Sequence, residues 1–193
     1  MNGRVFIIHR WGGNPNADWY PWLSNALESR GFEVFVPGMP NPDKPTIEEW
    51  VSTISNTVGK VDENTYFVGH SIGCQAILRF MEKAMGTAGG LLLVAPWLHL
   101  KKAAYESEED RRIARPWIEK PIDFGKIKAR EIRVIMATGD PYVPIEDSKI
   151  FEEMLGAIVN IMPIDTHFTE QDGYTELHVT LNEFMKMLHE KKP

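Results

Sequence analysis

Short, continuously apolar segments recur along this chain and are separated by stretches with helical spacing. The apolar segments are rich in β-branched and aromatic residues and cover positions 5–8, 32–36, 65–69, 90–95, 132–138 and 157–164. Because most of these segments are continuous rather than alternating, they predict strands that are buried on both faces. Such strands are typical of a parallel sheet covered by helices.

The intervening stretches place apolar residues at the spacing of amphipathic helices. One helix is expected after Asp18, which can cap it, and before Gly31, which can end it. The sequence TIEE at 46–49 fits a capping box for a second helix. Further helices are expected over 74–85, 146–155 and 174–188. This alternation predicts an α/β fold, a three-layer α/β/α sandwich around a mostly parallel six-stranded sheet with the order 2-1-3-4-5-6.

Residues 97–130 break the alternation because they are highly charged, contain Pro116 and Pro121, and carry no strand signal. We expect a small cap-like excursion over the carboxyl edge of the sheet, helical in part at 101–113. Aromatic side chains of this segment and of later loops are candidates for a substrate pocket, although they could equally serve only to anchor loops. They are Trp97, Tyr105, Trp117 and Phe124, together with Tyr142 and Phe168.

Length and composition predict one globular domain over residues 1–193, with 43% hydrophobic residues to fill its core. The net charge of −6, from 21 basic and 27 acidic residues, disfavours nucleic acids and anionic membranes as partners. Cys74 is the single cysteine, and we find neither a signal peptide nor an apolar segment long enough to span a bilayer. These features predict a cytoplasmic protein, and they leave the oligomeric state undefined.

The segment 65–69 leads directly into Gly69-His70-Ser71-Ile72-Gly73. This pattern is typical of a serine nucleophile at a strained turn between a strand and a helix, where glycine is needed because a Cβ would collide with neighbouring elements. His70 is expected to pack rather than to react. Cys74, one turn into the helix, is expected to be a buried structural thiol because no base is placed for it.

A serine hydroxyl needs a base within hydrogen-bond reach, and that base needs a carboxylate to fix its tautomer. Asp140 follows the strand at 132–138, and His167 follows the strand at 157–164, so both are predicted at the same sheet edge as Ser71. The chain order Ser71, Asp140, His167 is that of a hydrolase triad. Weaker alternatives are Asp147, expected to face solvent on a helix, Asp165, His99, His178 and His189.

The oxyanion that develops during acyl transfer needs two hydrogen-bond donors. We expect one from the backbone N–H of Ile72, at the start of a helix, and the other from the backbone N–H of Trp11 in the loop after the first strand. Gly12 and Gly13 of that loop could instead serve only to turn the chain. Nucleotide-binding glycine motifs and metal-binding motifs are missing from the sequence, so neither a cofactor nor a metal is predicted.

With these residues in place, the chain resembles the small serine hydrolases related to retinoblastoma-binding protein 9, including bacterial members. The likeness covers nearly the full length. It rests on VFIIH in the first strand, DWYPWLSNALESRG, VPGMPNPDKPTIEEW, GHSIG, APW, RPWIEKPIDFGKIK, GDPYVP and the HF at 167–168. The resemblance implies a minimal α/β-hydrolase fold and hydrolysis of a carboxylic ester or amide by Ser71, Asp140 and His167.

Two departures from the family pattern affect these expectations. Relatives commonly carry glycine directly after the first-strand histidine, where this chain has Arg10, and the backbone position of Trp11 depends on this residue. The motif L-x-C-x-E, to which the retinoblastoma name refers, is replaced by IGCQA at 72–76, so no retinoblastoma-type partner is implied. We therefore expect a serine hydrolase acting on a small-molecule acyl substrate; the alternative is a non-catalytic ligand- or protein-binding protein of the same fold.

Overall fold

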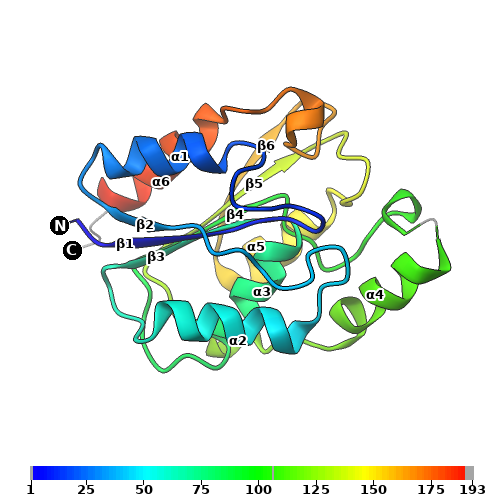
Figure 1. Cartoon of the computed structure of the whole chain (residues 1–193), viewed down its shortest axis with the longest axis horizontal. Coiled ribbons are helices and arrows are strands. Elements are labelled where there is room, and N and C mark those ends of the chain that lie inside the picture. The colour runs from blue at the N-terminus through cyan, green and yellow to red at the C-terminus, as the bar shows by residue number, and fades with distance from the viewer. Residues whose placement is uncertain (1, 106, 190–193) are drawn as a thin grey trace.

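The computed structural model describes residues 2–105 and 107–189, which form one six-stranded parallel sheet between two layers of helices (Figure 1). The strands are β1 (Arg4–Ile8), β2 (Glu33–Phe35), β3 (Thr65–His70), β4 (Gly90–Val94), β5 (Ile132–Ala137) and β6 (Ile158–Met162). The helices are α1 (Tyr20–Glu28), α2 (Ile47–Val58), α3 (Ile72–Met81), α4 (Glu108–Glu119), α5 (Asp147–Leu155) and α6 (His178–His189). The predicted α/β sandwich is confirmed.

The sheet order is β2-β1-β3-β4-β5-β6, and every pairing between neighbouring strands is parallel. This is the order expected from the sequence. Strands β1 and β3 are neighbours although β2 lies between them in the chain, so the topology reverses at this point. The loops after β1 and β3 therefore face each other across the crevice where ligands of such sheets bind.

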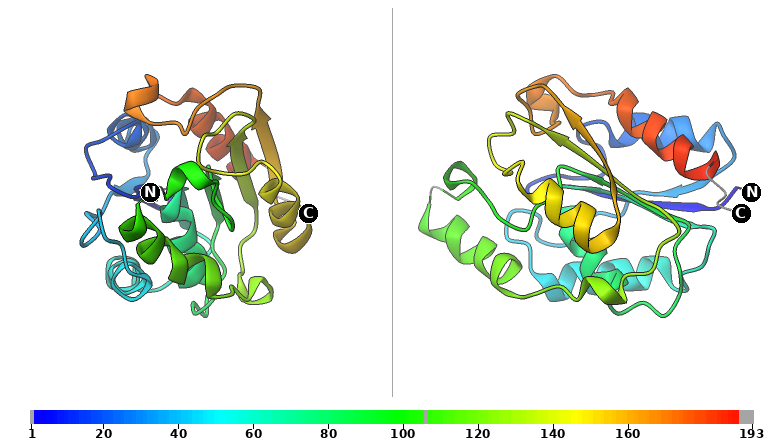
Figure 2. Two further views of the ribbon diagram at one scale, coloured as in Figure 1. Left: turned by 90° about the vertical axis from the view of Figure 1, so that its right-hand side faces the viewer. Right: turned by 180° about the vertical axis from the view of Figure 1, so that it is seen from behind.

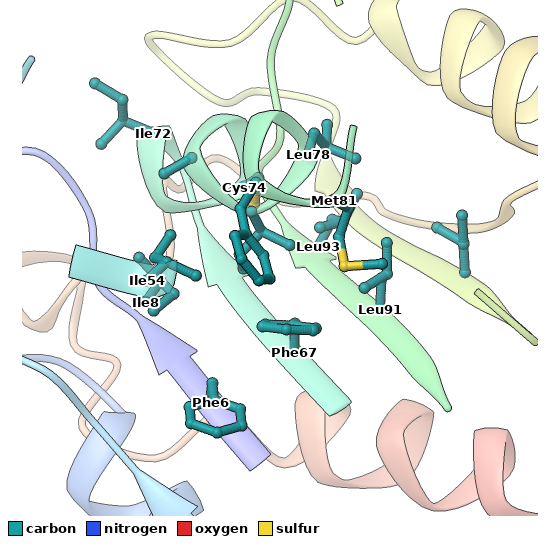
Figure 3. Packing of buried hydrophobic residues seen from close by; sticks show 14 of the residues in the cluster. Phe6, Ile8, Ile54, Phe67, Ile72, Cys74, Leu78, Met81, Leu91 and Leu93 are labelled. Atoms are coloured by element: carbon teal, nitrogen blue, oxygen red, sulfur yellow. The ribbon is translucent and has the colours of Figure 1, made fainter. Parts of the chain in front are cut away.

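The helices cover both faces of the sheet. Helices α1 and α6 lie together on one face, and α2, α3 and α5 lie on the other (Figures 1 and 2). Each face has its own core. Figure 3 shows the core under α3, where Phe6, Phe67 and Leu91 from the strands pack near Leu78 and Met81 from the helix. Burying one such side chain stabilises the fold by about 1.5–3 kcal/mol.

The excursion differs from its prediction. Residues Lys102–Ala104 form a short 3-10 helix, and the longer helix α4 covers Glu108–Glu119 instead of ending near residue 113. Ser107 caps α4 by accepting a hydrogen bond from the Asp110 N–H. Pro116 lies inside α4, where it removes one backbone hydrogen bond. The helix continues past it because Trp117 is buried on the body of the protein.

Two helix starts also differ from the sequence patterns. Asp18 does not cap α1: its backbone has a left-handed φ of 53°, and its carboxylate binds Arg10 instead. Helix α6 begins at His178, four residues later than expected. Thr46 does cap α2, as predicted, and accepts a hydrogen bond from the Glu49 N–H at 3.3 Å. None of the helices in the described ranges is long and apolar enough to cross a membrane.

Candidate active site

Ser71 lies at the turn between β3 and α3, at the carboxyl edge of the sheet. Its φ of 54° and ψ of −119° place a residue with a Cβ in a strained backbone conformation. Two backbone bonds hold the turn: the Ser71 N–H donates to the Val94 carbonyl at 2.9 Å, and the Cys74 N–H donates to the Ser71 carbonyl at 3.0 Å. This geometry is typical of a nucleophile turn, although Ser71 is largely buried here, with 7% of its surface exposed.

The glycines on either side of this turn are required by close backbone contacts. A Cβ on Gly73 would lie 2.3 Å from the Ile8 carbonyl oxygen, and a Cβ on Gly69 would lie 2.8 Å from the Cys74 nitrogen. Both distances are shorter than a carbon atom tolerates, so α3 approaches β1 and β3 this closely only because the two glycines lack side chains.

Cys74, the third residue of α3, is fully buried, and burial raises the pKa of its thiol.

Asp140 and His167 are hydrogen-bonded to each other. The Nδ1 atom of His167 lies 2.8 Å from Asp140 Oδ2, and both side chains are buried. Asp140 Oδ1 accepts hydrogen bonds from the backbone N–H groups of Tyr142 at 2.8 Å and Val143 at 3.0 Å. The carboxylate is therefore fixed by its own loop. Because this carboxylate is an acceptor, Nδ1 of His167 carries the proton and Nε2 is left as the basic nitrogen.

Ser71 and His167 line one cavity of about 460 Å³, and no hydrogen bond joins the Ser71 hydroxyl to the His167 ring within the described ranges. The Tyr142 ring packs edge-on against the His167 ring, with 5.1 Å between their centroids. The remaining wall is mostly aromatic and apolar, with a polar rim from the last loop. It is formed by Arg10, Trp11, Trp97, Leu100, Ala103, Ala104, Asp110, Pro141, Tyr142, Thr169, Gln171 and Asp172.

Two of the predicted pocket residues, Trp97 and Tyr142, line this cavity, and two others do not. Trp117 lies on the buried face of α4, where its indole N–H donates to the Pro45 carbonyl at 3.1 Å and its ring packs against Trp50. Phe168 belongs to the core on the opposite face of the sheet. The pocket prediction is revised for these residues because their rings are needed to fill the core. Tyr105 and Phe124 also lie outside the cavity wall.

The loop after β1 has a defined backbone. His9 is buried; its Nε2 accepts from the Met39 N–H at 3.1 Å, so its Nδ1 is the donor and contacts the Arg10 carbonyl at 2.8 Å. The Gly13 N–H also donates to this carbonyl, at 3.1 Å. Because the C=O and N–H of a trans peptide point in opposite directions, the Trp11 N–H is directed away from both donors.

The two N–H groups expected to form an oxyanion site remain free of protein acceptors. Within residues 2–105 and 107–189, neither the Trp11 nor the Ile72 backbone N–H donates to another protein group. The Arg10 side chain is held by two contacts: its Nε lies 2.8 Å from Asp18 Oδ2, and its Nη1 donates to the Trp11 carbonyl at 3.2 Å. Burial would lower the pKa of Arg10, but its contacts with Asp18 outweigh burial and raise it.

The structure corrects the expectation that Asp147 faces solvent. Asp147 is buried at the start of α5, where Oδ2 accepts from the N–H groups of Leu98 at 2.6 Å and His99 at 2.9 Å. The His99 ring binds Oδ1 of the same carboxylate at 2.6 Å. This pair anchors the start of the excursion. Asp165 and His178 are exposed, and the side chain of His189 lies outside the described part of the structure.

Sequence reasoning missed a buried group of polar side chains behind Ser71, centred on His70 and Tyr20. Tyr20 carries no functional signal in the sequence, and His70 is predicted only to pack. The spacing of apolar positions cannot reveal this group because both rings are as buried as the surrounding core. Among the described residues, no group of three or more His, Cys, Asp or Glu side chains is arranged to hold a metal ion.

The sheet order, the strained serine turn and the carboxylate–imidazole pair at the same edge are those of the α/β hydrolases. Solved structures of that class match the chain over nearly its whole length. A sequence model described as serine hydrolase matches residues 5–186. The chain belongs to this serine hydrolase family.

Individual relatives support the same assignment. The chain is 32% identical to the YdeN protein of Bacillus subtilis (strain 168) over 183 residues, which cover 93% of each chain. Its identity to serine hydrolase RBBP9 of Rattus norvegicus is 27% over 88% of this chain and 86% of the relative. The crystal structure of the B. subtilis ydeN gene product superimposes with a TM-score of 0.87 at 29% identity, covering 96% of this chain and 98% of that chain. The family resemblance seen in the sequence motifs is confirmed.

Proposed function

We propose that this chain hydrolyses a carboxylic ester or amide of a small molecule through an acyl-enzyme on Ser71. The observation that carries the proposal is the Asp140–His167 pair: the two side chains are 2.8 Å apart, and His167 lines the same cavity as Ser71. Chain segments far apart in sequence bring these three side chains to one sheet edge. No other described part of the fold combines a strained serine with an imidazole and a carboxylate.

Each residue then has a defined role in acyl transfer. Ser71 Oγ attacks the substrate carbonyl carbon while Nε2 of His167 takes the hydroxyl proton. The imidazolium that forms is stabilised by Asp140, whose other oxygen is already occupied by two backbone donors. His167 returns the proton to the leaving group, and water, activated by the same base, releases the acid from Ser71. The Ser71–His167 hydrogen bond needs to form only with substrate present, since such bonds are often long in ligand-free enzymes.

The negative oxygen of the tetrahedral intermediate would be bound by the N–H groups of Trp11 and Ile72. Ile72 is the first residue of α3, so the helix dipole adds a favourable field for negative charge. The Trp11 N–H is fixed by the two bonds that hold the Arg10 carbonyl. Donors that are set before reaction stabilise the transition state by about 2.7–4 kcal/mol each.

The cavity favours a small acyl or alcohol group without a negative charge. Its volume of about 460 Å³ and its walls of Trp11, Trp97 and Tyr142 suit apolar contact. The guanidinium of Arg10 at the rim is already paired with Asp18, so it provides no unbalanced positive charge for an anionic substrate. Carboxylesterases of Nitrososphaera gargenis are among the proteins with this fold.

Labelling with a fluorophosphonate probe tests this function. We expect the probe to modify Ser71, as mapped by mass spectrometry, and Ser71→Ala to abolish labelling and to lower hydrolysis of p-nitrophenyl acetate by about a thousandfold or more. Ser52→Ala, at an exposed position of α2, is the matched control and should behave as the parent protein. Hydrolysis that survives Ser71→Ala would refute the assignment. Binding of an ester without turnover would identify a non-catalytic member of the fold.

A further inference from the structure

Both ring nitrogens of His70, the residue before Ser71, are hydrogen-bonded in the interior of the protein. Nε2 lies 2.8 Å from the His167 carbonyl oxygen, and Nδ1 lies 2.7 Å from the Tyr20 hydroxyl. Because a carbonyl can only accept, Nε2 of His70 is the donor, and Nδ1 accepts the hydroxyl proton of Tyr20. The Tyr20 oxygen in turn accepts a hydrogen bond from the Arg10 N–H at 3.2 Å.

These bonds form one directional chain from the Arg10 N–H through Tyr20 and His70 to the carbonyl of His167. Its two ends lie in the two loops that must be set relative to Ser71. Arg10 directly precedes Trp11, the proposed oxyanion donor, and His167 is the proposed base. His70 is covalently attached to the nucleophile itself. One buried series of hydrogen bonds therefore links the backbone positions of the oxyanion donor, the base and the nucleophile.

The segment before α1 binds the base loop at further points. The Trp19 indole N–H donates to the Phe168 carbonyl at 3.1 Å, and Asp18 Oδ1 accepts from the Glu170 N–H at 2.8 Å. Phe168 has a left-handed φ of 60°, a strained conformation that persists only when its surroundings hold it. The loop that carries His167 is thus held from outside, by residues 18–20 and 70.

The charge states of His70 and Tyr20 keep this series of hydrogen bonds intact. Burial lowers the pKa of His70 to about 3, and the charges that face it are those of His167, Asp18 and Arg10. Burial also raises the pKa of Tyr20. Both groups therefore stay neutral near neutral pH, and the direction of their hydrogen bonds does not change. The His70 and His167 rings lie 5.3 Å apart between centroids. Because His70 is neutral, it does not repel the positive charge that His167 acquires when it takes the proton from Ser71.

We propose that Tyr20 and His70 are positioning residues, which set the oxyanion loop and the base loop relative to Ser71. The inference rests on the proposed hydrolase function. Neither side chain lines the cavity, so neither contacts substrate, and their effect is transmitted through Arg10 and His167. Breaking this series of hydrogen bonds should raise the barrier of the chemical step and leave substrate binding almost unchanged.

The variant Tyr20→Phe tests the proposal by removing one oxygen atom from the chain. We expect kcat for p-nitrophenyl acetate and the rate of fluorophosphonate labelling to fall together by about ten- to a hundredfold, as for small displacements of catalytic groups. The KM should change little, because the loss is confined to the transition state. Thr180→Val is the matched control: it removes another buried hydroxyl, which donates to the Leu177 carbonyl at 2.6 Å in the segment leading into α6.

Substitutions of His70 provide a rescue comparison. His70→Gln keeps an amide N–H that can reach the His167 carbonyl, whereas His70→Leu removes both hydrogen bonds. We expect His70→Gln to retain more of the parent kcat than His70→Leu at equal KM. If His70→Leu does not fold, Tyr20→Phe and Thr180→Val decide the question by themselves.

Two results would overturn the positioning role. One is a Tyr20→Phe protein with the parent kcat and labelling rate. The other is an equal loss of kcat in Thr180→Val, which would show that any buried hydroxyl matters to the same extent. Failure of the hydrolase function would look different, because the parent protein itself would then leave Ser71 unlabelled.

Discussion

At the scale of single residues, burial decides the charge of the groups behind Ser71. His70 has no exposed surface, and burial lowers its pKa from 6.5 to about 3. Between these two values the unfolded chain binds a proton that the folded protein does not. Acid therefore favours unfolding: the destabilisation is absent above about pH 6.5, grows as pH falls, and reaches its full size near pH 3. Burial lowers the pKa of His9 as well, with the same sign.

We predict that His70→Gln reduces the loss of stability between pH 7 and pH 4.5. A single group of this kind lowers the free energy of unfolding by about 1.4 kcal/mol per pH unit within its window. Urea denaturation at several pH values measures the slope. The comparison uses slopes because the substitution also changes stability at pH 7. His178→Gln, at an exposed position, is the control. Equal slopes in the parent and His70→Gln would contradict the prediction.

At the scale of elements, the excursion is fixed to the body by a buried cation. Arg79 of α3 donates from Nη2 to the carbonyls of Trp117 and Lys120, each at 2.8 Å. These carbonyls lie at the carboxyl end of α4, where the helix dipole favours a positive charge. The other end of α4 carries Asp110, which lines the cavity. Helix α4 therefore connects the core packing of α3 to the shape of the substrate site.

We predict that Arg79→Met lowers the free energy of unfolding by about 1–3 kcal/mol, because two buried carbonyls lose their donor. The KM should rise more than kcat falls, since a loosened α4 alters the cavity wall. Chemical denaturation and steady-state kinetics measure both effects. In the control Arg115→Met, an exposed pair with Glu119 is lost and stability should change by less than about 0.5 kcal/mol. An Arg79→Met protein as stable as the parent would show that desolvation of the cation cancels its hydrogen bonds.

At the scale of the whole molecule, one continuous sheet connects both cores. Trp19 is buried on the α1 face and Trp50 on the α2 face, and each is packed against strands of the same sheet. Neither layer of helices can lose its packing without exposing the strands that the other layer also covers. We therefore propose that the chain is a single cooperative domain.

The corresponding prediction is one unfolding transition. Far-ultraviolet circular dichroism and tryptophan fluorescence should give the same midpoint in urea, because Trp19 and Trp50 report on opposite faces of the sheet. Variants Trp19→Phe and Trp50→Phe, which each remove one buried tryptophan from one face, serve as controls and should keep a single midpoint. Two separated transitions would indicate that the layers unfold independently and would contradict a single domain.

The sequence by itself determined the topology and the positions of the three proposed catalytic residues. Continuous apolar segments predict a parallel sheet because strands buried on both faces need no alternation, and such strands share one carboxyl edge. Ser71, Asp140 and His167 each follow such a segment, so their common edge follows from chain order alone. Gly69 and Gly73 also had a clear meaning in the sequence, because glycine is needed on both sides of Ser71 where a Cβ would collide with neighbouring elements.

Tertiary structure decided whatever depends on contacts between segments distant in the chain. Asp147 is buried because the loop after β4 brings two N–H groups to it. The spacing of apolar residues along α5 gives no information about that loop. Trp117 fills the core instead of the cavity, since α4 extends through Pro116 once its apolar face is covered. Tyr20 and His70, fifty residues apart, meet only in the folded chain. The burial and hydrogen-bond partners of a side chain depend on segments that are distant in sequence. The periodicity of apolar residues along one segment therefore cannot predict them.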